Sequence, residues 1–210
     1  MTDVFDIDCR RCPRLAQFLD DVQEKYPEYH CRPVPPFGAG NARLLIVGLA
    51  PGMHGANRTG RPFTGDYAGV LLYETLHRFG FSSGPTSESA DDSLCLIDCR
   101  ITNAVKCLPP DNKPVGAEIN ACNEFLANEL ASMKMGSVVL ALGGIAHRAI
   151  LKAVGERQAA FKFGHAAEHN IDGHFTLLDS YHCSRYNTNT GRLTPEMFRT
   201  VFARARKLLD

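Results

Sequence analysis

The segment from Leu44 to Asp66 constrains the fold of this 210-residue chain more than any other. It opens with the short apolar run Leu44-Leu45-Ile46-Val47, which is typical of a strand buried on both faces of a parallel sheet. Gly48 ends the run, and the residues after it are rich in glycine and polar side chains. We expect them to form a loop rather than helix or strand. Open α/β sheets place their ligands in such loops, beyond the carboxyl ends of the strands.

The composition is that of a globular protein with one substantial core, with 44% apolar and 22% charged residues. We therefore expect residues 1–210 to form a single domain. No apolar run is long enough to span a membrane and no signal peptide is evident, which predicts a cytoplasmic protein. The formal net charge is zero, so a nucleic-acid surface would have to be local. Residues 182–210 are one basic candidate.

Apolar runs alternate with helical patterns along the chain. The runs predict strands at 44–47, within 94–105, at 137–142 and at 175–178. Helices are expected around 13–22, at 67–79, 116–133 and 144–154, and from Pro195 to the C-terminus, with Asp66 and Thr194 as N-caps. Residues 156–174 show poor periodicity. This alternation predicts a three-layer α/β/α sandwich around a central, mostly parallel four-stranded sheet.

Polar side chains follow three of the predicted strands. They lie in the loop up to Asp66, at Asn103 near the end of the second strand, and in His182–Arg192 after the fourth. Because the carboxyl ends of parallel strands share one edge of a sheet, we expect these segments to meet there.

Four sequence segments together resemble the iron–sulfur uracil-DNA glycosylases. They are GLAPG (48–52), GRPFTGD (60–66), TNAVKC (102–107) and HCSRYNTNTGR (182–192). The segments HGANRTG (54–60) and YNTNTGR (186–192) point to the type B, or family 5, branch. The resemblance implies a monofunctional DNA repair glycosylase that flips uracil out of double-stranded DNA and hydrolyses its N-glycosidic bond, leaving an abasic site. The branch also accepts other deaminated bases, such as hypoxanthine and xanthine. We further expect a monomer.

The resemblance assigns roles in a base pocket. Gly48-Leu49-Ala50 and Phe63 would bind the base, with the Phe63 ring as a stacking platform. Asn103 offers both a donor and an acceptor to a pyrimidine edge. His182 would donate to the base oxygen, where negative charge collects as the base departs. Asp66 would activate water or stabilise the cationic sugar.

Each of these residues also has a purely structural interpretation. Phe63 suits a core, Asn103 can bond its own backbone, and His182 can be structural. Asp66 can serve only as a helix N-cap, although both of its roles can hold at once.

A wider set of residues is expected to contact DNA. The resemblance implies that the loop after His182 enters the duplex, where Arg185 and Tyr186 would fill the gap beside the flipped base. The predicted DNA contacts are His54, Asn57, Arg58, Ser184, Arg185, Tyr186, Asn187 and Arg192.

The chain has eight cysteines, which in a reducing cytosol are thiols or metal ligands rather than disulfides. Cys9 and Cys12 have the spacing of a metal or cluster loop, and Cys107 and Cys122 lie 15 positions apart. Four thiolates suit a [4Fe–4S] cluster or zinc, and the resemblance favours the cluster. Cys122 also fits the apolar stripe of its helix, as a buried free thiol would. The free cysteines are predicted to be Cys31, Cys95, Cys99 and Cys183.

Two positions depart from the family pattern and keep alternatives open. Leu49 stands where the sister iron–sulfur branch has an acidic residue, and other glycosylases have polar residues nearby. Cys183 stands where the family commonly has proline. A non-catalytic iron–sulfur or zinc nucleic-acid-binding module of the same fold is therefore the main alternative. A redox protein using Cys9 and Cys12 fits poorly. The motifs contain no lysine placed for a Schiff base, which predicts no lyase activity.

Overall fold

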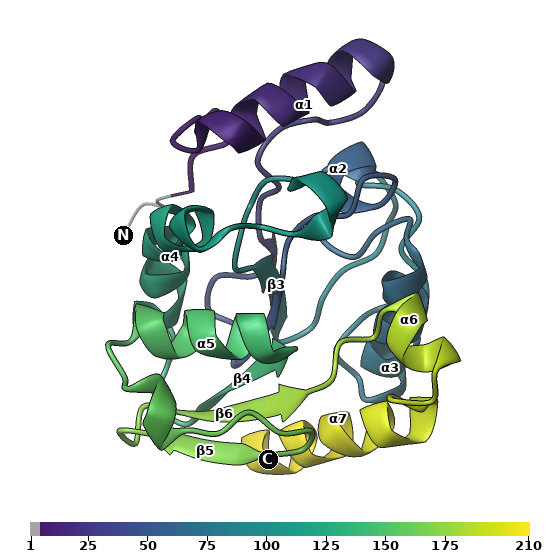
Figure 1. The fold of residues 1–210 in the computed structure, drawn as a ribbon. Coiled ribbons are helices and arrows are strands. Elements are labelled where there is room, and N and C mark those ends of the chain that lie inside the picture. The colour runs from purple at the N-terminus through teal and green to yellow at the C-terminus, as the bar shows by residue number, and fades with distance from the viewer. Residues whose placement is uncertain (1–4) are drawn as a thin grey trace.

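The structure, a computed structural model, describes residues 5–210, and one mixed sheet runs through them (Figure 1). Its strands lie in the order β1-β3-β2-β4-β6-β5. They are β1 (Phe37–Gly38), β2 (Leu44–Gly48), β3 (Cys99–Asn103), β4 (Ser137–Leu142), β5 (Glu168–Ile171) and β6 (Phe175–Ser180). The four predicted strands form the parallel centre of the sheet, with Ile46 opposite Ile101 and Leu140 opposite Leu178.

The prediction of four strands was too low, because an antiparallel strand is added at each edge of the sheet. β1 pairs with β3, and β5 pairs with β6. β1 has only two residues and lies in a Pro/Gly-rich segment, while β5 is polar until Ile171. Neither strand carries the apolar run or the alternation that marks a strand in a sequence.

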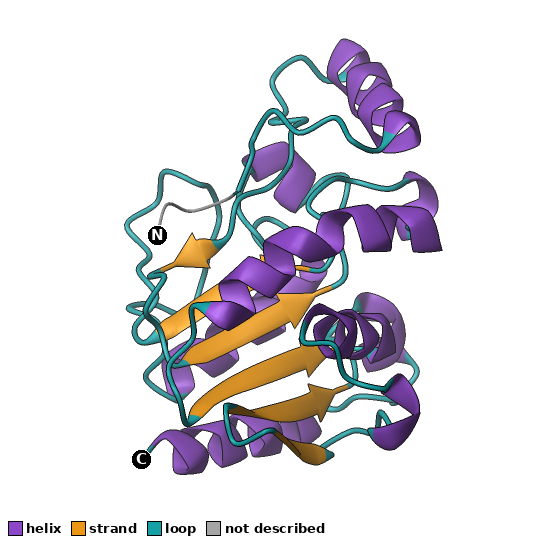
Figure 2. Cartoon of the chain, turned by 90° about the vertical axis from the view of Figure 1, so that its left-hand side faces the viewer, coloured by secondary structure: helices purple, strands orange, loops and turns teal. Residues whose placement is uncertain are grey.

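Helices cover both faces of the sheet, as the predicted sandwich requires (Figure 2). Alternate strand residues point to opposite faces. Leu44 and Ile46 pack with α3 (Tyr67–Arg78) and α7 (Pro195–Leu209), whereas Leu45 and Val47 pack on the side of α4 (Gly116–Ala131) and α5 (Gly144–Ala153). The continuous apolar run of β2 therefore feeds two separate cores.

The helix α1 (Pro13–Lys25) lies outside these layers, at the opposite end of the molecule from α7 (Figure 1). Its Leu19 and Val22 pack against Cys31 and Leu108 in a small third core. The Arg14 guanidinium forms a salt bridge with the buried Glu118 carboxylate of α4, with 2.8 Å between Arg14 Nε and Glu118 Oε1. These contacts attach α1 to the segment that carries two of the candidate metal-ligating cysteines.

Short helical turns occupy parts of the predicted loops. They are α2 (Ala56–Thr59), α6 (Arg185–Asn189), and the 3₁₀ turns η1 (Pro110–Asn112) and η2 (Gln158–Ala160). The expectation that the segment after Gly48 contains no helix was therefore wrong. The turn of α2 closes because the Gly55 carbonyl accepts the Thr59 amide, and it ends at Gly60, whose φ of 77° is left-handed.

Both predicted N-caps are confirmed. Asp66 Oδ1 accepts a hydrogen bond from the Gly69 amide at 2.8 Å, and Thr194 Oγ1 accepts one from the Met197 amide at 3.2 Å. Across the described part of the chain, none of the helices combines the length and apolarity needed to cross a membrane.

Candidate active site

A cavity of about 330 Å³ opens where the central strands end. Most of its lining comes from the loop after β2, from the last residue of β3 and from the segment after β6, which confirms the expected meeting of these three segments. Ala68 of α3 and Asn112 of η1 complete the lining. The lining residues are Leu49, Ala50, Gly52, Ala56, Phe63, Asp66, Ala68, Asn103, Asn112, His182 and Ser184. Its volume lies at the small end of the range for ligand cavities.

Gly48 allows two of these side chains to meet at the end of β2. A Cβ atom at this position would lie 2.4 Å from Asn103 Oδ1 and 2.7 Å from Phe63 Cζ, closer than any side chain permits. Asn103 Oδ1 is buried and has no hydrogen-bond partner within the described structure. A buried amide oxygen without a partner is costly, so it favours a ligand that brings an N–H group.

Phe63 is held in a strained conformation by its neighbours. Its φ of 54° is left-handed, which is unusual for a bulky residue. The Tyr73 hydroxyl donates to the Pro62 carbonyl at 2.8 Å, and Thr64 Oγ1 lies 2.7 Å from Ser87 Oγ. The Phe63 ring is 6% exposed and stacks with the His182 ring at a centroid distance of 5.8 Å. It belongs to the core and also lines the cavity, so the two interpretations of this residue coexist.

Asp66 caps α3 with one oxygen and faces the cavity wall with the other. A Cβ atom on Gly55 would lie 2.6 Å from Asp66 Oδ2, so the carboxylate is packed directly against the glycine backbone. Burial raises the pKa of Asp66, and the amides of Gly69 and Ala68 partly offset this rise. The helix cap and the cavity carboxylate are thus one group.

His182 is electrically neutral in the folded protein at neutral pH. Burial lowers the pKa of His182 to about 4, because a charged ring loses its hydration there. The Asn187 side-chain amide donates to the His182 carbonyl at 2.8 Å and so fixes the backbone that carries the ring. A neutral imidazole can still donate one N–H into the cavity.

This pKa shift predicts a pH-dependent loss of stability. The unfolded chain takes up a proton at His182 near pH 6.5, while the folded chain resists protonation down to about pH 4. The free energy of unfolding therefore falls as the pH drops through this window. We expect urea titrations at pH 6.5 and pH 4.5 to show a smaller fall for His182→Gln than for the wild type. Equal falls in the two proteins would contradict a His182 ring whose pKa is lowered to about 4 in the folded protein.

A larger groove of about 800 Å³ adjoins the cavity, and Gly52, Asp66 and Asn112 line both. His54, Arg58 and Arg185, three of the residues predicted to contact DNA, also line the groove. The Arg185 guanidinium lies 4.9 Å from the centre of the Tyr67 ring. Tyr186 is 72% exposed on α6, and Ser184 caps that helix.

Asn57 does not fit its predicted role in DNA contact. Its side chain is fully buried, and its amide donates to Cys31 Sγ at 3.5 Å. The prediction was wrong because Asn57 lies in α2, which turns this side chain inward while Arg58 stays exposed.

The basic C-terminal segment is only partly available for DNA. Arg199 and Arg204 on α7 form salt bridges with Glu74 and Glu168, each at 2.7 Å. Arg206 lies over the Phe81 ring. Arg192 is exposed, and its guanidinium lies 4.7 Å from the centre of the Tyr181 ring, so it stays a candidate for contact with DNA, although only Arg185 lines the groove.

The four candidate metal-ligating cysteines line one small cavity beneath α1. Cys9 and Cys12 lie just before this helix, Cys107 follows β3, and Cys122 lies in α4. All four are free thiols, and the Lys106 amide donates to Cys122 Sγ at 3.3 Å. Burial, and then the neighbouring sulfur atoms, raise the pKa of Cys107 to about 12. Four thiolates in so apolar a cavity need a positive centre between them.

Comparison with known proteins shows the family of this chain. The family model for the uracil DNA glycosylase superfamily matches residues 35–206. These include every lining residue of the cavity of about 330 Å³ that contains Phe63, Asp66, Asn103 and His182. The chain belongs to this superfamily. The match confirms the resemblance that the motifs predicted.

Several relatives of this superfamily member bear the same name, type-5 uracil-DNA glycosylase. One from Thermus thermophilus is 47% identical over 205 residues, covering 95% of this chain and 93% of the relative. One from Pyrobaculum aerophilum is 45% identical over 203 residues, covering 95% and 88%. One from Mycobacterium tuberculosis is 43% identical over 209 residues, covering 95% and 78%.

Asn112 is a polar lining residue of this superfamily member's site that sequence reasoning missed, as it missed the small lining residues Gly52, Ala56 and Ala68. Asn112 lines both the cavity and the groove. Its φ is positive, at 56°, as is the φ of 53° at the preceding residue, Asp111. The signal was present in Pro109-Pro110, which marks a tight turn, but nothing local shows that this turn lies at the cavity mouth.

Proposed function

We propose that this superfamily member is a monofunctional uracil-DNA glycosylase that releases uracil from double-stranded DNA and leaves an abasic site. The observation that carries the proposal is the cavity in which Phe63, Asn103, Asp66 and His182 meet. Relatives that share nearly the full length of the chain are named for this activity. A stacked base hides its sugar bond, so the substrate base must leave the duplex to enter the cavity.

Recognition of the base rests on Phe63 and Asn103. Stacking on the ring is worth about 1–3 kcal/mol per base. The unpartnered Asn103 Oδ1 accepts the ring N–H of uracil, while the Asn103 amide donates to a carbonyl oxygen of the base. A base without an N–H at that position leaves this buried oxygen unsatisfied.

The chemistry is hydrolysis of the bond between C1′ of the sugar and the base nitrogen. As this bond breaks, its electron pair leaves with the base and negative charge grows on the base oxygen. The neutral His182 ring donates a hydrogen bond to that oxygen. Water adds to C1′, and the Asp66 carboxylate accepts its proton or stabilises the cationic sugar.

The groove beside the cavity is the proposed path of the DNA strand. Arg58 and Arg185 line this groove and supply positive charge for phosphates. The exposed Arg192 adds to that charge from outside the groove, and the exposed Tyr186 can fill the space that the flipped base leaves. His54, Ser184 and Asn187 complete the proposed DNA surface.

The side chains that line the cavity support a wider substrate range. Its wall contains Ala50, Gly52, Ala56 and Ala68, which are small, and Leu49, which offers no side-chain hydrogen bond. Such a wall does not reject a purine by charge or by an unpaired polar group. We therefore include hypoxanthine and xanthine among the proposed substrates.

The cysteine cavity is the proposed site of a [4Fe–4S] cluster held by Cys9, Cys12, Cys107 and Cys122. The donor set fits, because all four thiols are free and the Lys106 amide stabilises one sulfur. When bound, the cluster supplies a positive centre that crosslinks α1 to α4. A single zinc ion fits less well, since tetrahedral Zn–S bonds of about 2.3 Å would draw the sulfurs closer together. Within residues 5–210, the ligand group whose atoms lie within 4.8 Å of one another contains no cysteine.

Loss of the cluster should destabilise the protein without touching the base cavity. We expect Cys107→Ser to lose the brown colour and the broad visible absorbance and to melt at a lower temperature, because the crosslink is gone. Cys95→Ser is the matched control, since Cys95 is an exposed free thiol. Iron analysis and thermal unfolding of both variants measure the effect. Iron retained in Cys107→Ser would contradict the assignment.

A duplex assay tests the proposed function. Purified protein is incubated with duplexes that carry uracil, hypoxanthine, xanthine or a thymine mismatch, and alkali then converts abasic sites into strand breaks. We expect breaks with uracil and no covalent adduct on borohydride treatment. A non-catalytic nucleic-acid-binding module would bind the duplexes without releasing a base, which would overturn the proposal. The cytoplasmic location and the monomeric state stay predictions.

A further inference from the structure

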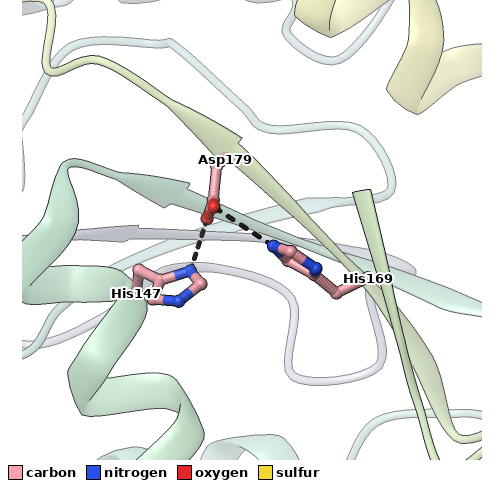
Figure 3. Close-up of side chains that lie close together, drawn as sticks. All are labelled: His147, His169 and Asp179. Carbon is pink, nitrogen blue, oxygen red and sulfur yellow. Dashed lines mark hydrogen bonds and ion pairs between the residues drawn. The ribbon is translucent and has the colours of Figure 1, made fainter. Parts of the chain in front are cut away.

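A second polar cluster lies away from the base cavity, between α5 and the edge of the sheet. It consists of His147 on α5, His169 on β5 and Asp179 on β6 (Figure 3). One ligand-type atom of each residue lies within 4.8 Å of the other two. His147 and Asp179 are buried, and the His169 side chain is 17% exposed. None of the three lines the base cavity or the adjoining groove.

His147 faces an oxygen acceptor on each side of its ring. Nε2 lies 3.0 Å from the Phe161 carbonyl oxygen, and Nδ1 lies 2.7 Å from Asp179 Oδ1. A carbonyl only accepts, so Nε2 must carry a hydrogen. In a neutral ring the lone pair of Nδ1 then points at a carboxylate. That arrangement is stable only if a second proton lies between the two atoms or a metal ion beside them binds both.

His169 adds a third donor atom to the same point. Its Nε2 is buried, has no hydrogen-bond partner within the described structure, and lies 3.5 Å from Asp179 Oδ2. A second proton on His147 would satisfy His147 but would leave His169 Nε2 with only its 3.5 Å contact to Asp179 Oδ2, too long for a good hydrogen bond. A metal ion satisfies both rings and the carboxylate at once. This comparison favours the metal over the proton.

The chemistry and the surroundings suit a transition-metal ion. Two imidazole nitrogens and one carboxylate are ligands that Zn²⁺ prefers. Ligating histidines usually donate their other ring N–H to a carbonyl, as His147 does to Phe161. The Gly164 amide also donates to Asp179 Oδ2, at 3.3 Å. His169 lies opposite Leu177 in the β5–β6 register, so it shares a sheet face with Asp179, two residues further on.

We propose that His147, His169 and Asp179 form a binding site for one first-row divalent cation, with Zn²⁺ as the best match. Bound there, the ion would tie α5 and the edge strand β5 to β6, which leads directly into His182. Its expected effect is on the stability of this edge of the sheet rather than on hydrolysis of the base. The proposal does not depend on the proposed function.

Calorimetric titration with Zn²⁺ tests the site. The protein is first treated with a chelator to remove loosely bound metal ions. Its visible absorbance then shows whether the cluster still occupies the cysteines. We expect the wild type to bind one equivalent of Zn²⁺ and to melt at a higher temperature with it, while Mg²⁺ changes neither. His169→Gln should bind Zn²⁺ at least about tenfold more weakly.

The matched control is His174→Gln. His174 lies between β5 and β6 and is partly buried, but its Nε2 donates to the Met133 carbonyl, away from the cluster. The His174→Gln variant should bind Zn²⁺ as tightly as the wild type does. If His169→Gln does not fold, Asp179→Asn replaces it, with circular dichroism as the check. Absence of Zn²⁺ binding in the wild type, or equal binding by the ligand variant and the control, would overturn the proposal.

Discussion

The Asp66→Asn variant is expected to remain folded and to lose most of its excision of uracil. The loss should be about 10²- to 10⁴-fold in the single-turnover rate, the usual contribution of a positioned acid or base. The fold should survive because asparagine caps helices as well as aspartate does, so the hydrogen bond from the Gly69 amide can remain. Quenched-flow or gel assays on a uracil duplex with excess enzyme measure this rate directly.

A second cap variant controls for changes in helix stability. Thr194→Asn alters the N-cap of α7, which lies away from the cavity, and should excise uracil at the rate of the wild type. Thermal unfolding of both variants shows whether the caps hold. Excision by Asp66→Asn at the wild-type rate would remove the carboxylate from the proposed mechanism and leave it only its structural role.

The Gly48→Ala variant is expected to damage the cavity as severely, although it adds a single methyl group. The new Cβ would lie 2.4 Å from Asn103 Oδ1 and 2.7 Å from Phe63 Cζ, so one or both must move. Displacement of a positioning group by about 1 Å can cost about 10²-fold in rate. We expect such a loss in excision, together with weaker binding of a duplex that carries an abasic-site analogue.

Gly116→Ala is the control for this variant. An added Cβ at Gly116 meets no atom within 4 Å, and the residue begins α4 away from the cavity. It should excise uracil normally. Gly48→Ala must also retain its cluster absorbance and its cooperative unfolding for the comparison to hold. Normal excision by a folded Gly48→Ala would show that Asn103 and Phe63 do not need their present positions.

These variants depend on features that local sequence determines to different degrees. The central strands β2 and β4 could be predicted because a continuous apolar run is stable only when both of its faces are buried. The caps at Asp66 and Thr194 could be predicted because an N-cap acts on amides three residues away. The motifs also indicated correctly which segments would line the cavity.

Other features depend on contacts between distant parts of the chain. Asn57 is buried, Asn112 reaches the cavity mouth, and the polar strand β5 forms only because β6 offers it a free edge. The cluster of His147, His169 and Asp179 joins residues up to 32 positions apart. No local pattern marks these positions, because their environment is set by the neighbours that packing supplies.

Taken by itself, the sequence determined the four central strands, the starts of the longer helices and, through its motifs, the family. The strands and helices follow from the period of apolar side chains and from hydrogen bonds within one turn. The tertiary structure alone decided which polar side chains face the cavity, which are buried and which face one another. Those outcomes depend on how the layers pack, and packing is a property of the whole chain.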